Sequence, residues 1–273
     1  MIVVLSYWLD EKGMVLYVAY RATRESKDRS TLPHSLRALG CRQLHRSFWE
    51  VNEENVNRVL KVLEKNQPIL LRRIREIRKP RLAKDGVLDI GSLVIVMYAT
   101  PKEFKREKIK NILKRAPCIR ICRSVYAFSH KHSLFDREHR LVNAVRFSEF
   151  IKEIHEDVKV IPRVVLQDTT SVERLIQETR EHLEREISDI IMSSQELYSQ
   201  VFVGDNAQLI RDSHLMNQRR FMRVKRMAAF YERWLQIDFS RNLMRSYRAI
   251  RKVSSVLERG PSVKITASSA TYR

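Results

Sequence analysis

The 273-residue chain is poor in glycine and cysteine. Six glycines leave little room for the Gly-rich loops that hold phosphates, and the Gly-x-Ser-x-Gly turn of hydrolases does not occur. The three cysteines, at positions 41, 118 and 122, are an odd number without the spacing of a disulfide framework. We therefore expect a reduced, cytoplasmic protein.

Long apolar runs are also missing. None approaches the roughly 20 residues that span a bilayer, so we expect no membrane segment. The first residues lack the basic stretch, apolar run and cleavage site of a signal peptide. A chain of this length has room for about two or three compact units, each with its own core.

Negative charge is scarce. The chain has 52 lysines and arginines against 32 aspartates and glutamates, which gives a formal net charge of +20 and a pI of about 10.2. This surplus favours a polyanionic partner, first the phosphate backbone of DNA or RNA and second an anionic membrane surface. The alternative is a solvated basic surface without a ligand. The placement of the charges must decide between them.

The chain contains one unit twice. Residues 41–49, Cys-Arg-Gln-Leu-His-Arg-Ser-Phe-Trp, return as residues 118–126, Cys-Ile-Arg-Ile-Cys-Arg-Ser-Val-Tyr. Cysteine and the Arg-Ser pair keep their places, and an aromatic residue follows Arg-Ser each time. Upstream, residues 13–20 and 91–98 both begin with glycine and end with tyrosine. Two copies of a small folding unit predict two similar units in tandem, an architecture that one copy would not predict.

The first copy has the pattern of a ferredoxin-like unit. Apolar, β-branched stretches alternate with two helical patterns in the order β-α-β(β)-α-β, which is the split βαβ arrangement. The expected elements are a strand at 14–21, a helix from Ser30 to Gly40, a strand pair at 41–51, a helix between Asn52 and Pro68, and a strand at 69–77.

The second copy repeats this order. The expected elements are strands at 93–100, 118–128 and 159–166, helices at 105–115 and 141–156, and an insertion at 130–140. We therefore predict an α+β fold with two tandem ferredoxin-like units. The first unit spans residues 1–78 and the second 91–168, with a basic linker at 79–90.

The composition changes to helix formers after Asp168. We predict an α-helical C-terminal region at 169–259 and a flexible tail at 260–273. In its first helix apolar residues recur every seven positions. This spacing predicts a seam at 172–201 on which another helix packs, and a partner protein is one candidate source of that helix. The seam consists of Ile176, Leu183, Ile190 and Leu197, flanked by Val172, Thr179 and Ile187. On a third helix, at 240–258, the apolar stripe consists of Leu243, Tyr247, Ile250 and Leu257.

Arginines line up on the last two helices. The spacing places each set along one helix face, with neighbours roughly 5 to 6 Å apart, comparable with successive phosphates. The planar guanidinium suits phosphate better than a lysine ammonium. The first row is Arg219, Arg223, Arg226 and Arg233, and the second is Arg241, Arg245, Arg248, Lys252 and Arg259. We interpret both rows as nucleic-acid-binding, the alternative being a solvated face.

Arg46 and Arg123 hold matching places in the repeat. One interpretation has both arginines contact a nucleic-acid backbone from equivalent points. The other has the residues after them pack a sheet, and we favour it for Phe48, Trp49, Val125 and Tyr126 because aromatic residues in strands are usually core. Two more groups of basic residues lie at 72–84 and 102–115. For the second group, an ordinary amphipathic helix explains the pattern almost as well as nucleic-acid binding does.

One segment is rich in potential metal ligands. His130, His132, Asp136 and His139 all lie in the insertion of the second copy. The two cysteines on the preceding strand are four residues, or about 13 Å, apart and cannot share one ion. Polar loops of this composition are usually only polar loops, so we expect no metal site and no cofactor.

The repeated unit resembles the Cas-two-like ferredoxin family, which includes CRISPR-adaptation endonucleases, phenylacetate-type repressors and chromate-resistance regulators. The resemblance lies in a strand ending in tyrosine, a short helix ending near glycine, and a strand that carries the Ser-aromatic pattern. It covers residues 13–77 and 91–166 and implies the tandem ferredoxin-like fold. The helices after Ser171, ending at residues 230–235, resemble the helical hairpin of the chromate-resistance regulators.

The chain departs from the nuclease members of that family at one position. In those members the first strand ends in Tyr-Asp, and the aspartate holds the metal ion. Here Tyr20 is followed by Arg21 and Tyr98 by Ala99. Cleavage then has no metal anchor, and the resemblance implies a non-catalytic nucleic-acid-binding protein, with double-stranded DNA favoured over RNA. The alternatives are a divergent metal-dependent nuclease using the 130–139 insertion and an assembly subunit docked through the 172–201 seam.

Overall fold

The structure is a computed structural model, and it describes residues 15–21, 31–82, 86, 88–99, 103–133, 141–154, 157–203 and 207–259. The chain divides into two compact units, residues 1–178 and 179–273, and the division falls inside one long helix. Within the described ranges, no helix combines the length and the apolar character needed to cross a membrane. The tail predicted at 260–273 lies outside these ranges.

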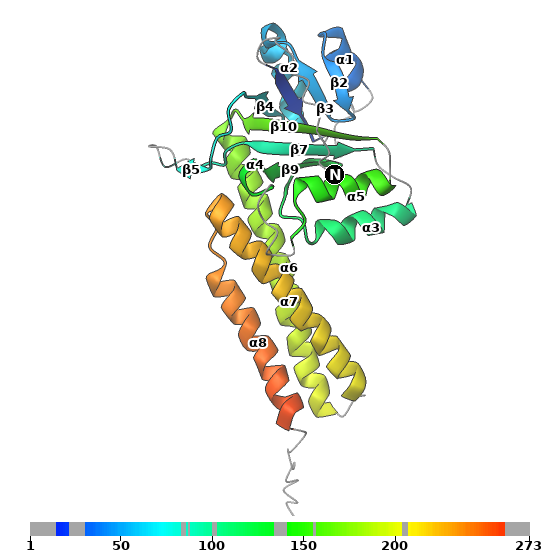
Figure 1. The fold of residues 1–273 in the computed structure, drawn as a ribbon, viewed down its shortest axis with the longest axis vertical. Helices are drawn as coiled ribbons and strands as arrows, with labels where there is room; N and C mark the ends of the chain where they lie inside the picture. Colours follow the sequence, from blue (N-terminus) through cyan, green and yellow to red (C-terminus); the bar gives the residue numbers. More distant parts are fainter. Residues whose placement is uncertain are drawn as a thin grey trace, which may run out of the picture. The chain divides into compact units, whose positions relative to one another are not determined.

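The first unit is built on an eight-stranded antiparallel sheet (Figure 1). Its strand order is β2-β3-β1-β4-β10-β7-β9-β8. The strands are β1 (Leu16–Ala19), β2 (Arg42–His45), β3 (Phe48–Val51), β4 (Ile69–Arg73), β7 (Leu93–Tyr98), β8 (Ile119–Cys122), β9 (Val125–Ser129) and β10 (Val158–Leu166). Sheet and helices together confirm the predicted α+β class.

Two halves of four strands make up this sheet, and the first follows the order strand, helix, strand, strand, helix, strand. The second follows the same order with one additional four-residue helix after its third strand. The helices are α1 (Leu32–Ala38) and α2 (Val56–Leu63) in the first half, with short 3-10 turns η2 (Glu53–Asn55) and η3 (Glu64–Asn66), and α3 (Glu103–Leu113), α4 (His130–Ser133) and α5 (Ala144–Ile154) in the second. In each half the fourth strand lies beside the first, the first beside the third, and the third beside the second. The halves join where β4 pairs with β10.

Helices cover one face of each half-sheet, α1 and α2 on one side and α3 and α5 on the other (Figure 1). The core under α1 and α2 includes Trp49 and Leu63, and the core under α3 and α5 includes Phe128 and Phe147. All residues of β1 and β7 are buried, so the opposite faces of these strands are covered as well. Burial on both faces explains why these strands are continuous apolar runs.

The hairpin ends of the two halves approach each other at a place away from the β4–β10 pair. His45 Nε2 donates to the backbone oxygen of Tyr98 at 3.1 Å. Lys159 Nζ donates to the backbone oxygen of Leu44 at 2.9 Å. These contacts bring one end of each half-sheet together. The two halves therefore meet at a second place, even though β2 and β8 lie at opposite edges of the sheet.

Some element boundaries differ from those that the sequence predicts. The predicted linker contains a short hairpin, in which β5 (Arg81–Leu82) pairs with β6 (Leu88–Asp89). The long helix begins at Thr169, before Ser171, because Asp168 Oδ1 accepts a hydrogen bond from the backbone nitrogen of Ser171 at 2.6 Å and caps the helix.

The second unit consists of three helices: α6 (Thr169–Val203), which contributes its residues from 179 onward, α7 (Ala207–Leu235) and α8 (Ser240–Arg259). Leu197, Ile210 and Val253, one from each helix, share a core. Asn217 on α7 donates from Nδ2 to Ser193 Oγ on α6 at 3.0 Å. The three predicted helices are therefore present, and they pack on one another.

The heptad seam of α6 is buried by helices of the same chain. From residue 179 onward, Leu183, Ile187, Ile190 and Leu197 are all buried, whereas Ile176 is only half-buried. Because α7 and α8 pack on this part of α6, the seam predicted for a partner helix is occupied within the chain. The stripe predicted on α8 is also corrected, because its buried residues include Ser246 and Val253 while Tyr247 is exposed.

A buried histidine lies between α7 and α8. Gln218 Nε2 donates to His214 Nε2 at 3.0 Å, and Ser254 Oγ lies 2.9 Å from the same nitrogen. Burial lowers the pKa of His214, and the carboxylate of Glu258 offsets part of this shift. Folding therefore favours the neutral imidazole.

The stability of the protein is expected to fall below about pH 6.5, the ordinary pKa of histidine. In the window between that value and the lowered pKa of folded His214, the unfolded chain binds more protons than the folded chain, so the free energy of unfolding decreases as pH falls. Urea unfolding at several pH values measures this slope. The slope should become shallower in His214→Gln.

Candidate nucleic-acid interface

Helix α8 carries a continuous row of exposed cations. The spacing of the row, by four, three and four residues, keeps the side chains on one face. The members of this α8 row are Arg241, Arg245, Arg248 and Lys252, and all four are exposed. The buried residues Ser246, Ile250 and Val253 occupy the opposite face of the helix. Packing of α8 therefore leaves the row in solvent. The side chain of Arg259, the last predicted member, lies outside the described part.

No described carboxylate lies within ion-pairing distance of the α8 row. Residues 240–257 contain neither aspartate nor glutamate. Arg251 is also exposed, on the adjacent face of α8, and adds one cation that does not belong to the α8 row. The positive charge of α8 is therefore uncompensated along roughly 16 Å of helix, at about 1.5 Å per residue.

The arginines of α7 behave differently from those of α8. Arg223 pairs with Glu186 at 3.3 Å, and Arg220 pairs with Asp189 at 3.8 Å, both partners being on α6. Arg233 donates from Nε to the backbone oxygen of Ala229 at 3.2 Å. Part of the predicted α7 row thus holds the bundle together.

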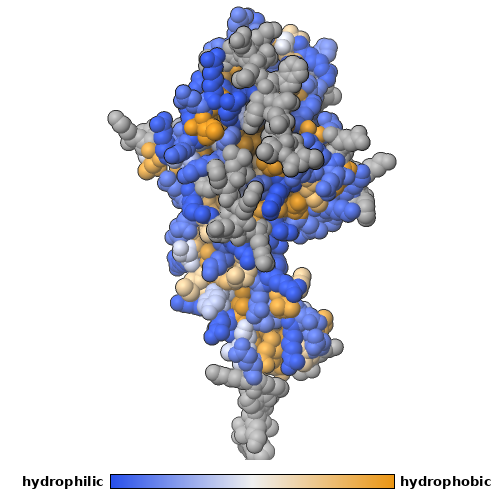
Figure 2. Space-filling view, viewed as in Figure 1, coloured by the Kyte–Doolittle hydropathy of each residue, from blue (hydrophilic) through white to orange (hydrophobic). Residues whose placement is uncertain are grey.

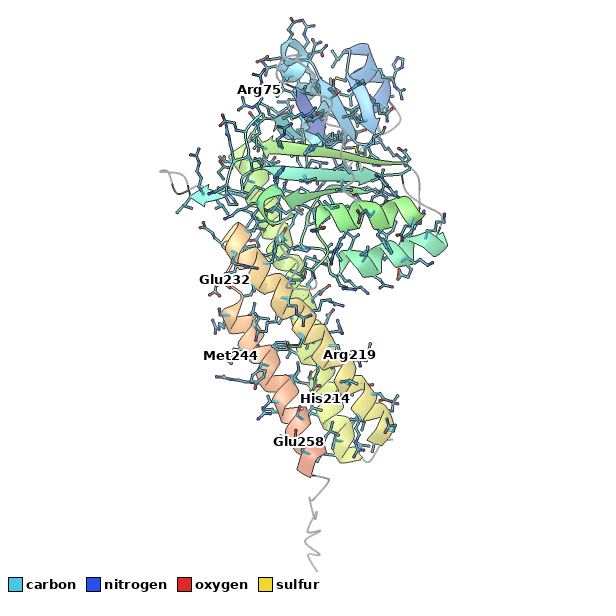
Figure 3. All side chains as sticks on the ribbon, in the orientation of Figure 1. Arg75, His214, Arg219, Glu232, Met244 and Glu258 are labelled. Atoms are coloured by element: carbon cyan, nitrogen blue, oxygen red, sulfur yellow. The ribbon has the colours of Figure 1, made fainter. Side chains whose placement is uncertain are left out.

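Two members of the α7 row remain accessible. Arg219 is exposed and Arg226 is half-buried, and neither has a carboxylate partner among the described residues. Figure 3 shows Arg219 on the side of α7 that faces away from α8. The structure therefore separates predicted contact residues that are exposed, such as Arg219, from others, such as Arg223, that are already paired.

Arg46 and Arg123 lie in equivalent turns of the first unit. The first turn joins β2 to β3 and the second joins β8 to β9. The backbone oxygens of Ser47 and Ser124 accept hydrogen bonds from the backbone nitrogens of the tyrosines that end β1 and β7, at 3.1 and 3.2 Å. Both arginines are exposed, so both are placed to meet a ligand.

The residues that follow these arginines are mostly core. Phe48, Trp49 and Val125 are fully buried. Tyr126 is half-buried and stacks on Tyr98, with ring centroids 6.1 Å apart. These positions agree with the structural role that the sequence favours for them.

Arg21 occupies the position where the resemblance places a metal-binding aspartate. Its Nε donates to the backbone oxygen of Ile121 at 2.7 Å, and Nη2 donates to that of Arg120 at 2.5 Å. Its Nη1 donates to both carboxylate oxygens of Glu178, at 2.5 and 2.7 Å. The guanidinium therefore joins the end of β1 to β8 and to α6.

This cross-link is not predicted by any pattern in the sequence. The arginine in place of the aspartate is visible there, but Glu178 is 157 positions away along the chain and no motif links the two residues. Only the folded chain brings the carboxylate and the two carbonyl oxygens to one guanidinium.

The predicted metal ligands are not gathered by the described part of the chain. Asp136 and His139 lie outside the described residues, as does the side chain of His132. His130 is half-buried, and burial followed by the charge of Arg163 lowers its pKa. Among the described residues, no group of three histidines, cysteines, aspartates or glutamates is placed to hold a metal ion.

The cysteines offer no nucleophile. Burial raises the pKa of Cys118 and of Cys122 to about 12, and it also raises the pKa of Cys41. At neutral pH these side chains are thiols, whereas the thiolate is the reactive form.

Some members of the two other basic groups make local contacts. On α3, Lys105 Nζ donates to the backbone oxygen of Ile154 at 2.7 Å and Lys110 pairs with Glu107 at 3.0 Å. In the linker hairpin, Arg81 pairs with Asp89 at 3.6 Å. In the α8 row, by contrast, no member has a carboxylate partner among the described residues.

The geometry of the α8 row defines the candidate site as an exposed cationic face of a helix. Comparison of the chain with protein-family models, with curated protein sequences and with solved structures found no match in any of the three. The arrangement of charge on the helices therefore carries the functional argument.

Proposed function

We propose that the protein binds nucleic acid without cleaving it, with double-stranded DNA as the favoured ligand and RNA as the second. The α8 row carries this proposal, because four exposed cations stand in line with no carboxylate partner among the described residues. Neighbours in the row are roughly 5 to 6 Å apart, a spacing comparable with that of phosphates along a strand. Contacts of this kind depend little on base sequence.

We also infer that the two halves of the sheet are tandem ferredoxin-like units of the Cas-two-like kind. The strand order and connections of each half agree with that topology. The equivalent exposed turns at Arg46 and Arg123 support the same inference. In this proposal the two units form a pseudo-dimeric scaffold, and the turn arginines supply further phosphate contacts.

Arg21 supports binding without cleavage. A metal ion at the end of β1 would meet a guanidinium that already contacts Glu178 and two backbone oxygens. The positive charge opposes a divalent cation, and the nearby carboxylate is neutralised by the arginine. The metal-dependent route to phosphodiester cleavage therefore lacks its anchor at this position.

A salt titration of binding tests the proposal. The four cations of the α8 row alone predict a slope of about −3.6 for log K against log salt on duplex DNA and of about −2.8 on a single strand, and contacts from the turn arginines make it steeper. The measurement uses fluorescein-labelled duplex DNA, single-stranded DNA and RNA of matched sequence. A slope near zero on all three would contradict phosphate binding.

The same complexes test for cleavage. With Mg²⁺ or Mn²⁺ added, the labelled DNA and RNA are expected to remain intact when run on a denaturing gel. Metal-dependent cleavage that disappears in His132→Ala and Asp136→Ala would instead support the nuclease alternative, since both residues belong to the insertion of the second copy.

A further inference from the structure

Exposed apolar side chains are concentrated on the three helices of the second unit. Among the described residues, 14 large hydrophobic side chains are exposed, of which 10 lie beyond residue 179 and four are spread over the first unit. In Figure 2 hydrophobic surface interrupts the hydrophilic surface over α7 and α8. Phosphate binding alone does not require exposed apolar side chains.

Two contacts define how α7 and α8 lie against each other. The rings of Phe221 and Tyr247 have centroids 6.2 Å apart, and His214 Nε2 lies 2.9 Å from Ser254 Oγ. As the residue number rises along α7 it falls along α8, so the helices are antiparallel. In this register Met222 lies level with residues 246–247 of α8.

This register places four half-exposed apolar residues along the border between α7 and α8. Leu215 and Met222, seven positions apart, lie on the flank of α7 that borders α8. Met244 and Tyr247, three positions apart, lie on the flank of α8 that borders α7. Their exposed fractions are 44% for Leu215, 46% for Met222, 51% for Met244 and 47% for Tyr247. We call this set the α7–α8 apolar strip.

Cations border this strip on both sides, and the exposed Arg251, seven positions after Met244, lies on the same flank of α8 as the strip. Arg219 lies on the α7 side, and the α8 row lies on the other side. Residues 213–231 and 240–257 contain ten arginines and lysines but no aspartate or glutamate. Figure 3 shows Glu232 and Glu258 toward opposite ends of the helix pair, with Met244 between them.

We propose that the α7–α8 apolar strip docks an acidic amphipathic helix of a partner protein. An apolar strip between two antiparallel helices accepts the apolar side of another helix, whose residues recur at positions i, i+3, i+4 and i+7. The arginines on both borders select glutamate and aspartate on the flanks of that helix. Exposed methionines suit such a site because their unbranched side chains adapt to the partner.

The docking proposal does not require that the protein binds nucleic acid, but both ligands contact the α8 row. If DNA occupies that row, an acidic helix on the strip competes with it, and the partner then regulates DNA binding. This consequence rests on the proposed function, whereas docking itself does not.

The test uses the full chain and a labelled peptide on the order of 20 residues long, which as a helix is about 30 Å long and extends past both ends of the strip. The peptide carries leucine at the two apolar positions of each heptad and glutamate on both flanks. The matched peptide has serine in place of leucine and the same charge. We expect the leucine peptide to bind at least tenfold more tightly in fluorescence anisotropy, and equal binding of the two would reduce the site to a charge effect and overturn the proposal.

Variants locate the site. Met222→Ser together with Met244→Ser should weaken binding of the leucine peptide at least tenfold, while Met192→Ser with Met216→Ser, which alters two equally exposed methionines elsewhere, should leave it unchanged. Circular dichroism checks that both double variants keep their helices. Equal affinity in the two variants overturns the proposal.

Two further outcomes are distinguishable. Sedimentation of the chain alone reveals self-association, and a dimer lost only in Met222→Ser/Met244→Ser would assign the strip to a second copy in place of an acidic helix. Because the same variant retains every arginine, its salt slope on duplex DNA should match that of the unaltered chain. Failure of DNA binding with intact peptide binding would overturn the proposed function and leave the docking site standing.

Discussion

The triple variant Arg241→Gln, Arg245→Gln and Arg248→Gln is expected to bind duplex DNA with a salt slope smaller in magnitude by about 2.7, since each phosphate contact contributes about 0.9. Glutamine keeps the length and helix propensity of the side chain and removes only its charge. Between roughly 50 and 200 mM salt, the affinity of the variant should fall about 40-fold less than that of the unaltered chain. At low salt the variant should bind more weakly. The measurement is a salt titration in fluorescence anisotropy.

A matched variant separates the α8 row from the net charge of the protein. Arg58→Gln, Lys61→Gln and Lys65→Gln remove the same three charges from exposed positions on and after α2. If the row is the site, this control keeps the slope of the unaltered chain. Equal slopes in the two triple variants would mean that DNA senses the overall charge, and the assignment of the α8 row would be wrong.

Replacement of Arg21 with alanine is expected to lower the free energy of unfolding by about 2 to 3 kcal/mol. The change leaves two backbone oxygens and the carboxylate of Glu178 without their donor. We expect no larger loss because the side chains of Arg21 and Glu178 are 23% and 40% exposed, so that water replaces part of the lost bonding. Urea unfolding followed by circular dichroism measures the difference.

Two variants calibrate this result. Arg81→Ala removes an arginine that is 72% exposed and pairs only with Asp89 in the linker hairpin, and it should cost less than about 1 kcal/mol. Glu178→Gln keeps an acceptor oxygen for Arg21 and should have an effect between these two. If Arg21→Ala costs no more than Arg81→Ala, Arg21 is not the cross-link between β1, β8 and α6 that the geometry indicates.

Periodicity in the sequence predicts the helices and most strands well. The helix expected at 240–258 corresponds to α8 within two residues at its ends. The repeated Arg-Ser pairs lie in equivalent turns of the two half-sheets. Such patterns are local, because a helix or a hairpin is defined by residues only a few positions apart. The linker hairpin escaped prediction because two-residue strands carry too few positions to show alternation.

The candidate site could be predicted only in part. Spacing alone predicts both arginine rows, but it cannot distinguish Arg241, which is exposed on α8, from Arg223, which pairs with Glu186 on α6. The α7–α8 apolar strip also escaped prediction. Its residues fall on the flanks of two helices, and their proximity depends on the antiparallel register that Phe221 and Tyr247 report.

The sequence by itself determined the charge surplus, the duplicated unit, the helical region and the direction in which each arginine row runs along its helix. These properties depend on composition and on spacing within single elements. The tertiary structure alone decided that α7 and α8 cover the α6 seam, that Arg21 meets Glu178, and that the α8 row stays in solvent. The physical reason is that ion pairing and burial depend on distances between segments far apart in the chain, and only packing of the folded chain sets those distances.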